Sequence, residues 1–123
     1  MGKKHMVIIG MLLAFISILK FNNGYKITIT NNTDKVVIDL ELKYKVGVSI
    51  QTIRKIEAKK SWKYNIDTSS LEAENAIILK YKNNKDNVYE ESIVGYLEKG
   101  YNGQASVAIN KIDENGKLEI EVK

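Results

Sequence analysis

The chain has no cysteine, no proline and a single histidine, His5, among its 123 residues. Without cysteine it cannot form a disulfide framework, a cysteine-ligated zinc site, a cysteine nucleophile or a lipid-modified cysteine. One histidine close to the start is too little for a catalytic triad or a multi-histidine metal site. We therefore expect no catalytic residues, no metal site and no cofactor, and the sequence predicts a protein that is not an enzyme.

An excess of charge of one sign is also lacking in most of the chain. The 19 Lys and Arg residues against 15 Asp and Glu residues give a net charge of +4. Three of these cations, Lys3, Lys4 and Lys20, flank an apolar run near the N-terminus, so from residue 22 onward sixteen cations face fifteen anions. A nearly neutral body gives no support to nucleic-acid binding, and we expect no nucleic-acid partner.

Residues 6–19 are an apolar run of 14 residues in which Ser17 is the one polar side chain. A cationic start followed by an apolar run is typical of export signals, although a helix of this length spans only about 21 Å of a hydrocarbon layer of about 30 Å. A signal peptidase prefers small residues at positions −3 and −1, and Ala14 is followed by the bulky Phe15 and Ile16.

The sequence therefore favours an uncleaved signal anchor over residues 1–21, a hydrophobic helix that contacts the membrane through residues 6–21, followed by a linker at 22–24. The preceding lysines place the N-terminus in the cytoplasm and residues 25–123 outside the cell membrane. A cleaved signal that releases a secreted protein, and a buried core helix, are the alternatives.

After the linker, apolar and polar residues alternate with the period of two that is typical of half-buried strands. The alternation at 38–44 places Ile38, Leu40, Leu42 and Tyr44 on one face. Further alternating or apolar stretches predict strands at 25–30, 48–56, 62–66, 77–81, 88–97, 105–112 and 118–122. Ile53 and Ile56 are spaced by three, which predicts a bulge or a bend in their strand.

Polar clusters separate these stretches and predict turns at 31–34, 57–60, 83–87 and 113–116. Serine followed three residues later by glutamate, within residues 68–74, matches a helix N-cap and indicates one or two helical turns there.

About eight short strands with turns every 8–12 residues predict an all-β fold, an antiparallel immunoglobulin-like β-sandwich over residues 25–123. A small β-barrel is the alternative. At the level of architecture the stretch resembles immunoglobulin-like sandwich domains of exported Gram-positive bacterial proteins, and this resemblance implies no functional residues.

Two features compete for an interaction surface. Residues 43–63 carry seven cations and one anion, and Lys55, Lys59 and Lys60 lie beside a predicted turn where side chains reach outward. Tyr96 and Tyr101 flank glycines in the predicted loop 95–103 and offer aromatic area. The lysines suit an anionic envelope polymer or lipid, and the tyrosines suit a protein or glycan. A solvated charged face without a ligand is the alternative for the lysines.

These features together indicate a non-enzymatic, membrane-anchored extracytoplasmic binding or interaction module whose ligand the sequence does not identify. The alternative is a structural component of a cell-envelope complex that self-associates through exposed sheet edges.

Overall fold

A computed structural model describes residues 24–123 of the protein, so the signal anchor predicted for residues 1–21 lies outside the described residues. The described part contains eight strands: β1 (Tyr25–Asn31), β2 (Val37–Tyr44), β3 (Ser49–Ile56), β4 (Ser61–Ile66), β5 (Asn75–Lys82), β6 (Val88–Leu97), β7 (Gly103–Ile112) and β8 (Leu118–Val122). Within residues 24–123, no helix is long and apolar enough to cross a membrane.

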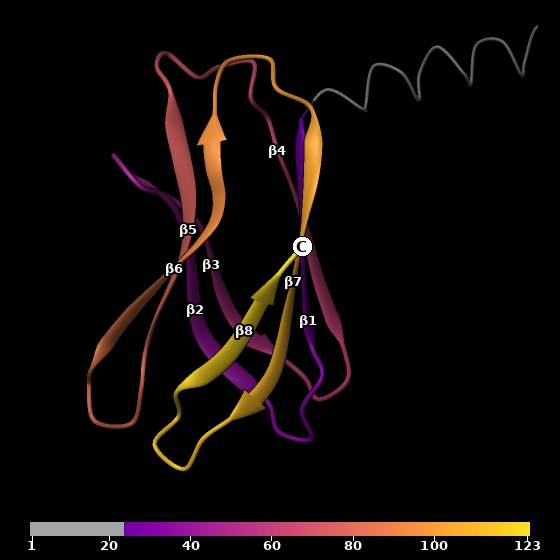
Figure 1. Cartoon of the computed structure of the whole chain (residues 1–123), viewed down its shortest axis with the longest axis vertical. Coiled ribbons are helices and arrows are strands. Elements are labelled where there is room, and N and C mark those ends of the chain that lie inside the picture. The colour runs from indigo at the N-terminus through magenta and orange to yellow at the C-terminus, as the bar shows by residue number, and fades with distance from the viewer. Residues whose placement is uncertain (1–23) are drawn as a thin grey trace, which may run out of the picture.

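The strands form two four-stranded sheets, and the all-β prediction is confirmed (Figure 1). One sheet has the order β4-β1-β7-β8, and the other has the order β3-β2-β5-β6. The chain passes between the sheets four times, after β1, β3, β4 and β6. Two open sheets that share one core form a β-sandwich, whereas the alternative barrel needs strands paired around a closed ring.

The prediction of purely antiparallel sheets is wrong for one pair. β1 and β7 run parallel, with Ile27 opposite Ala105 and Ile29 opposite Val107. A parallel pair needs a long crossover, and the strands that connect β1 to β7 supply it by passing through the other sheet. Local alternation cannot reveal this because it does not specify the direction of the neighbouring strand.

The core lies between the sheets and consists mainly of the alternating aliphatic residues that the sequence placed on one face. Full burial of each large aliphatic side chain contributes about 1.5–3 kcal/mol. The most deeply buried side chains of the described residues include Ile27, Ile29, Leu40, Leu42, Ile53, Ile77, Leu79, Leu97, Val107 and Ile109.

The predicted irregularity at Ile53 and Ile56 is a bend that β3 shares with β2. Val37 lies opposite Ile56 and Leu40 opposite Ile53, so both strands bury residues three apart. Asp39, which lies between Val37 and Leu40 in β2, has a left-handed backbone with φ of 56°. This residue changes which side chains of β2 face the core. A separate shift of register follows between Leu42 and Lys43.

The bend corrects the prediction for Ile38, which the regular alternation placed on the buried face. Val37 is buried in its place, and the side chain of Ile38 is 58% exposed. A strand that kept an extended backbone through Asp39 would bury residues 38, 40 and 42 together, but the left-handed residue interrupts that period.

The helical turns predicted at residues 68–74 are absent, because the structure has a single hydrogen-bonded turn and no helix there. Asp67 accepts bonds from both the backbone N–H and the hydroxyl of Ser69, at 2.9 and 2.6 Å. These local bonds engage the Ser69 backbone N–H, to which the glutamate of a capping box would bond, and orient the Ser69 hydroxyl toward Asp67, so they favour a turn. They also hold the pKa of the exposed Asp67 carboxyl below its usual value.

The sandwich has two distinct ends (Figure 1). Gly24 lies at one end, beside Gly103 and the β6–β7 loop, and its backbone N–H donates to Asn102 Oδ1 at 2.8 Å. The β1–β2, β3–β4, β5–β6 and β7–β8 connections lie at the opposite end (Figure 1). A strand of ten residues such as β7 spans about 33 Å, which is the scale of the separation between the two ends.

Candidate functional site

The sheet β3-β2-β5-β6 opens at the end opposite Gly24. β2 and β5 pair over four residues each, from Glu41 opposite Lys80 to Tyr44 opposite Ile77. Before Glu41, β2 stays paired with β3 on its other side, and beyond Lys80, β5 stays paired with β6. The two hairpins therefore diverge, as the lower half of Figure 1 shows.

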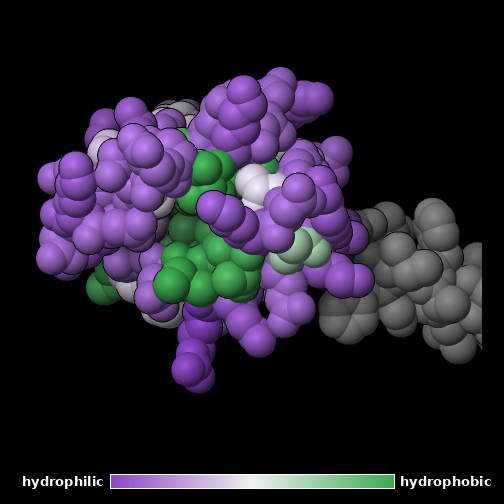
Figure 2. Space-filling view, turned by 90° about the horizontal axis from the view of Figure 1, so that it is seen from below, coloured by the Kyte–Doolittle hydropathy of each residue, from purple (hydrophilic) through white to green (hydrophobic). Residues whose placement is uncertain are grey.

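A groove of about 720 Å³ lies where the hairpins diverge. Residues of β2 form one wall, residues of β5 and the β5–β6 turn form the other, and Ile112, Gly116 and Leu118 come from the opposite sheet. Figure 2 shows apolar side chains gathered in a hollow at this end of the molecule. Two of the lining side chains, Val36 at 49% and Ile38 at 58% exposed, are large and apolar yet face solvent. The volume of the groove lies in the range of known ligand sites, about 300–1,000 Å³.

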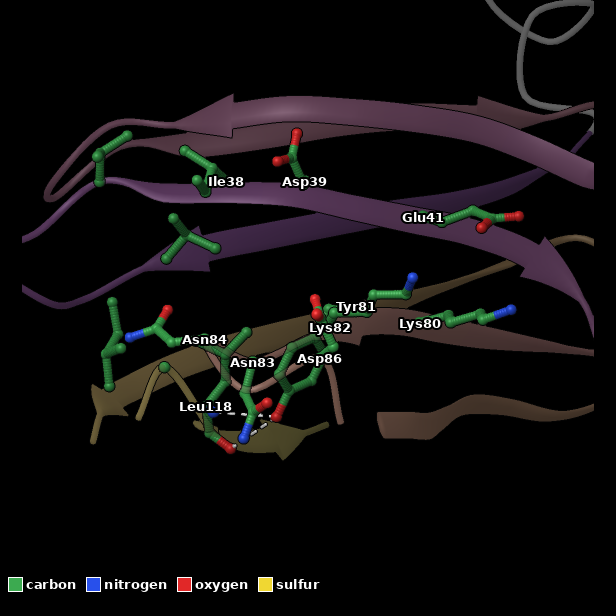
Figure 3. Close-up of a pocket in the computed structure, with 14 residues that line it drawn as sticks. Ile38, Asp39, Glu41, Lys80, Tyr81, Lys82, Asn83, Asn84, Asp86 and Leu118 are labelled. Atoms are coloured by element: carbon green, nitrogen blue, oxygen red, sulfur yellow. Dashed lines mark hydrogen bonds between the residues drawn. The ribbon is translucent and has the colours of Figure 1, made fainter. Parts of the chain in front are cut away.

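Tyr81 is a buried residue that lines the groove. Its hydroxyl accepts a hydrogen bond from the backbone N–H of Leu118 at 2.9 Å, in the buried space between the sheets (Figure 3). The ring stacks on Tyr89 with centroids 5.3 Å apart. Burial is the main reason that the pKa of Tyr81 is raised above its ordinary value. The phenol stays neutral at physiological pH and serves as a fixed hydrogen-bonding group.

At the mouth of the groove, the β5–β6 turn is hydrogen-bonded to the β7–β8 turn. Asn84 of the β5–β6 turn donates its backbone N–H to the Asn115 carbonyl at 2.7 Å. Gly116 has φ of 88°, and a Cβ there would lie 2.8 Å from Asn84 Oδ1. Only glycine satisfies both the backbone conformation and this close approach. The β5–β6 and β7–β8 turns are therefore held close together by packing and hydrogen bonds at the open end of the groove.

The walls of the groove carry charges of both signs. Asp39 and Glu41 lie on β2, Lys80 and Lys82 lie on β5, and Asp86 lies on the β5–β6 turn (Figure 3). Among residues 24–123 the ion pairs are Lys55–Glu57 and Lys59–Asp34, so neither wall contributes to one. In the same range no group of three or more histidine, cysteine, aspartate or glutamate residues could hold a metal ion.

Lys55 lies near the end of β3, Lys59 and Lys60 lie on the β3–β4 turn that follows, and all three predicted lysines are exposed. Lys55 pairs with Glu57 at 3.1 Å, and Lys59 pairs with Asp34 at 3.6 Å and donates to the Asn32 carbonyl at 2.7 Å. These neighbouring carboxylates reduce the local excess of positive charge. The turn also lies at the end opposite Gly24, away from the point where the preceding segment joins (Figure 1).

The two predicted tyrosines lie at the Gly24 end and contact each other. Their rings meet edge to face with centroids 5.6 Å apart, and Tyr96 is 45% and Tyr101 37% exposed. The Tyr96 hydroxyl donates to Glu98 Oε2 at 2.8 Å. This bond, together with Glu74, raises the pKa of Tyr96. The predicted lysines and tyrosines are thus separate surfaces at opposite ends of the sandwich.

Sequence reasoning did not predict the groove. One signal was available: Val36, Val37 and Ile38 are three consecutive apolar residues at the start of a strand. Because successive side chains of a strand point to opposite faces, at least one of them must face away from the core. The divergence of β2 from β5 depends on long-range pairing and leaves no comparable local pattern.

Comparisons with known proteins support the fold and no more. The chain matches no protein-family model and no curated protein. It is similar to a protein from Eubacterium rectale whose structure was determined by NMR, with 17% sequence identity and a TM-score of 0.51. The similarity covers 81% of this chain and 88% of that one. At this identity, the shared feature is the arrangement of strands.

Proposed function

We propose that the protein is a non-enzymatic interaction module whose immunoglobulin-like sandwich, residues 25–123, is held outside the cell membrane by residues 1–21. The groove between β2 and β5 is the observation that carries the proposal. It is the kind of concave, partly apolar surface on which proteins bind ligands, and its charged walls supply specificity.

The position of the groove supports an anchored arrangement. Gly24, where the apolar N-terminal segment joins, lies at one end of the sandwich, and the groove opens at the other (Figure 1). A domain tethered through Gly24 would present its groove away from the bilayer. The same geometry places the lysines of the β3–β4 turn far from the tether, so an envelope polymer or a protein is a better partner for them than the anchoring membrane.

The experiment on location follows the full-length protein in the cells that produce it. We expect it to stay with membranes after high-salt and carbonate washing, and we expect external protease to digest residues 25–123 in intact protoplasts. A mature N-terminus between residues 15 and 25, with the protein in the medium, would contradict the anchor and favour cleavage.

The experiment on binding uses the absence of native cysteine. A photo-crosslinker is attached in living cells at Val36→Cys, inside the groove, or at Val88→Cys, outside it. Both valines are 49% exposed, so the two positions are matched. Crosslinked species formed only from position 36 support the groove as the binding surface. Identical species from both positions, or none, would contradict it.

The alternative of a self-associating envelope component finds support in the outer strands β3, β4, β6 and β8, which end the two sheets. Such edges can pair with further copies. Sedimentation of the full-length protein in detergent at several concentrations separates the two functions. A mass that rises with protein concentration favours self-association, and a constant monomer favours the binding module.

A further inference from the structure

The groove exposes the edges of two strands that face each other. Val37, Ile38 and Leu40 of β2 have a strand partner on the β3 side only, and Tyr81 and Lys82 of β5 have one on the β6 side only. Each edge therefore presents backbone N–H and C=O groups toward the groove without a strand partner there. Such a row of groups is complementary to another extended backbone.

The space between the diverging parts of β2 and β5 is a gap in the sheet. The interior of the groove lies on the side of this gap that faces the other sheet, and it is apolar. Tyr81 and Leu118 are buried, Ile112 is half-buried, and all three line the groove. An extended segment lying between β2 and β5 would point alternate side chains toward this surface. Those side chains would be apolar, since the carbonyl and N–H of Leu118 are already bonded to Tyr81.

The side chains that such a segment points outward would lie near charges of both signs. Asp39 lies on one side, Lys82 and Asp86 lie on the other, and Glu41 and Lys80 face each other where the strands begin to pair. A charged side chain placed there would be attracted to some of these groups and repelled by others, and would lose hydration in the process. Uncharged polar side chains fit this position best.

From this geometry we propose that the groove binds an extended, uncharged segment of a partner protein, which adds a strand between β2 and β5. The segment alternates apolar residues, facing the groove interior, with neutral polar residues, facing solvent. This inference rests on the proposed binding function and specifies its ligand class.

A second copy of this chain fits less well. Each of its outer strands carries charged residues, which the groove does not favour: Arg54 and Lys55 on β3, Lys63 on β4, Glu90 and Glu91 on β6, and Glu119 and Glu121 on β8. The chain's own residues 6–19 are apolar except for Ser17 and do not alternate with polar residues, so they would expose apolar side chains to solvent. Gly24 also lies at the other end of the sandwich. Both occupants are outcomes that the experiments below distinguish.

Asp39 keeps the gap open. In a regular strand, Leu40 and Asp39 would continue the register of β2 onto Tyr81 and Lys82, but pairing stops at Glu41. The left-handed backbone of Asp39, with φ of 56°, turns β2 away from β5 at this point. Aspartate adopts this conformation more readily than a β-branched residue does.

The test uses the full-length, isotope-labelled protein in detergent micelles and a synthetic heptapeptide of alternating valine and threonine with blocked ends. We expect the peptide to shift the backbone amide signals of Val37–Leu40 and of Tyr81 and Lys82. A peptide N-methylated at alternate residues keeps its side chains but loses hydrogen-bond donors, and we expect it to bind at least about tenfold more weakly. Replacing the threonines with lysine, or with glutamate, is expected to weaken binding in both cases.

Matched variants locate the binding. Val36→Lys, on the groove wall, is expected to weaken peptide binding at least about fivefold. Val88→Lys, at an equally exposed valine outside the groove, is expected to leave it unchanged. Asp39→Gly retains the left-handed conformation and should keep the gap open, with hydrogen exchange at Leu40 and Tyr81 like that of wild type. Asp39→Val favours an extended backbone, which should close the gap, slow hydrogen exchange at Leu40 and Tyr81, and reduce binding.

Several results would overturn the inference. They are equal binding of the N-methylated peptide, amide shifts outside β2 and β5, and equal loss in Val36→Lys and Val88→Lys. A nitroxide attached at Ser17→Cys that broadens the Val36 and Ile38 signals would identify the chain's own N-terminal segment as the occupant. Concentration-dependent shifts of the same amides without peptide would identify a second copy. In each case crosslinking from position 36 in cells still tests the broader binding function independently.

Discussion

The hydroxyl of Tyr81, on β5, accepts a hydrogen bond from the backbone N–H of Leu118, on β8, at 2.9 Å. The two residues belong to different sheets and are 37 positions apart in the chain. This bond joins the sheets directly beneath the groove. It supplies a partner for an amide that would otherwise be buried without one.

Replacing Tyr81 by phenylalanine removes the acceptor and keeps the ring. We expect Tyr81→Phe to lower the free energy of unfolding by about 1–3 kcal/mol, because the Leu118 N–H loses its partner in a buried position. Urea denaturation of residues 22–123 measures the change. Tyr64→Phe serves as the control, since Tyr64 is only partly buried against the core, whereas Tyr81 is buried, and the change at Tyr64 is expected to cost less. Equal costs at the two positions would contradict a specific role for the Tyr81 hydroxyl.

Stability is expected to decrease at alkaline pH. Burial raises the pKa values of Tyr44 and Tyr81 above the ordinary value of 10.0. A group whose pKa is higher in the folded state holds its proton more tightly there. Its stabilisation is therefore complete below pH 10.0 and is lost as pH rises through the folded-state pKa. Urea midpoints between pH 8 and 12 should fall above about pH 10, and less steeply in Tyr81→Phe. A flat profile would contradict the prediction.

Asn31 is fully buried at the end of β1, and its side chain organises the β1–β2 turn. Its amide nitrogen donates to the carbonyls of Lys35 and Ile56 at 2.7 and 2.9 Å, and its oxygen accepts from Thr33. Asn31→Leu leaves these groups unsatisfied, and we expect a cost of about 2–5 kcal/mol.

The neighbouring Asn32 is the control for Asn31, because its side chain is exposed and bonds to Asn110 at 3.0 Å. Asn32→Ala is expected to cost under about 1 kcal/mol in the same urea experiment. A small cost at Asn31 would mean that water or a rearranged turn replaces its hydrogen bonds.

Leu40 and Ile120 test the depth of the core at two predicted apolar positions. Leu40 is fully buried, so Leu40→Ala should cost about 2–5 kcal/mol. Ile120 is only half-buried against the core, so Ile120→Ala should cost less, about 1–2 kcal/mol. Chemical denaturation of residues 22–123 gives both values. A cost below about 0.5 kcal/mol at Leu40 would contradict the register of β2.

Pull-down of the protein with anionic liposomes or cell wall tests which of the two predicted interaction surfaces binds, the lysines or the tyrosines. If the lysines bind, high salt and the triple change of Lys55, Lys59 and Lys60 to glutamate should abolish binding. Because carboxylates already neighbour two of these lysines, we expect weak binding. Binding that persists in salt but is lost with Tyr96→Ala and Tyr101→Ala assigns the surface to the tyrosines. If the protein binds neither material, the lysines are a solvated charged face without a ligand.

Local pattern predicted most strands and turns correctly for a physical reason. At β1 and β8, alternating side chains are sufficient, because each strand has one face on the core and the period of two follows from the extended backbone. The polar clusters at 83–87 and 113–116 form turns because aspartate and asparagine side chains bond to nearby backbone, as Asn83 does to the N–H groups of Lys85 and Asn87.

The candidate lysines and tyrosines were predicted to be exposed, and they are, because charge and nearness to a turn are local properties, although Tyr96 lies in β6 and not in the predicted loop 95–103. Their separation to opposite ends of the sandwich was not predictable. It depends on which loops the strand order gathers at each end, and that order follows from pairings between residues far apart in the chain, such as Ile27 with Ala105.

By itself, then, the sequence determined an all-β chain with a nearly neutral body, no cysteine chemistry and strand positions close to those observed. Only the tertiary structure decided that β1 and β7 run parallel, that Ile38 faces solvent, and that β2 separates from β5 to form a groove. The physical reason is that hydrophobic alternation records burial one residue at a time. Backbone turns such as that at Asp39, and the choice of strand neighbours, are set by the whole packed assembly of the two sheets.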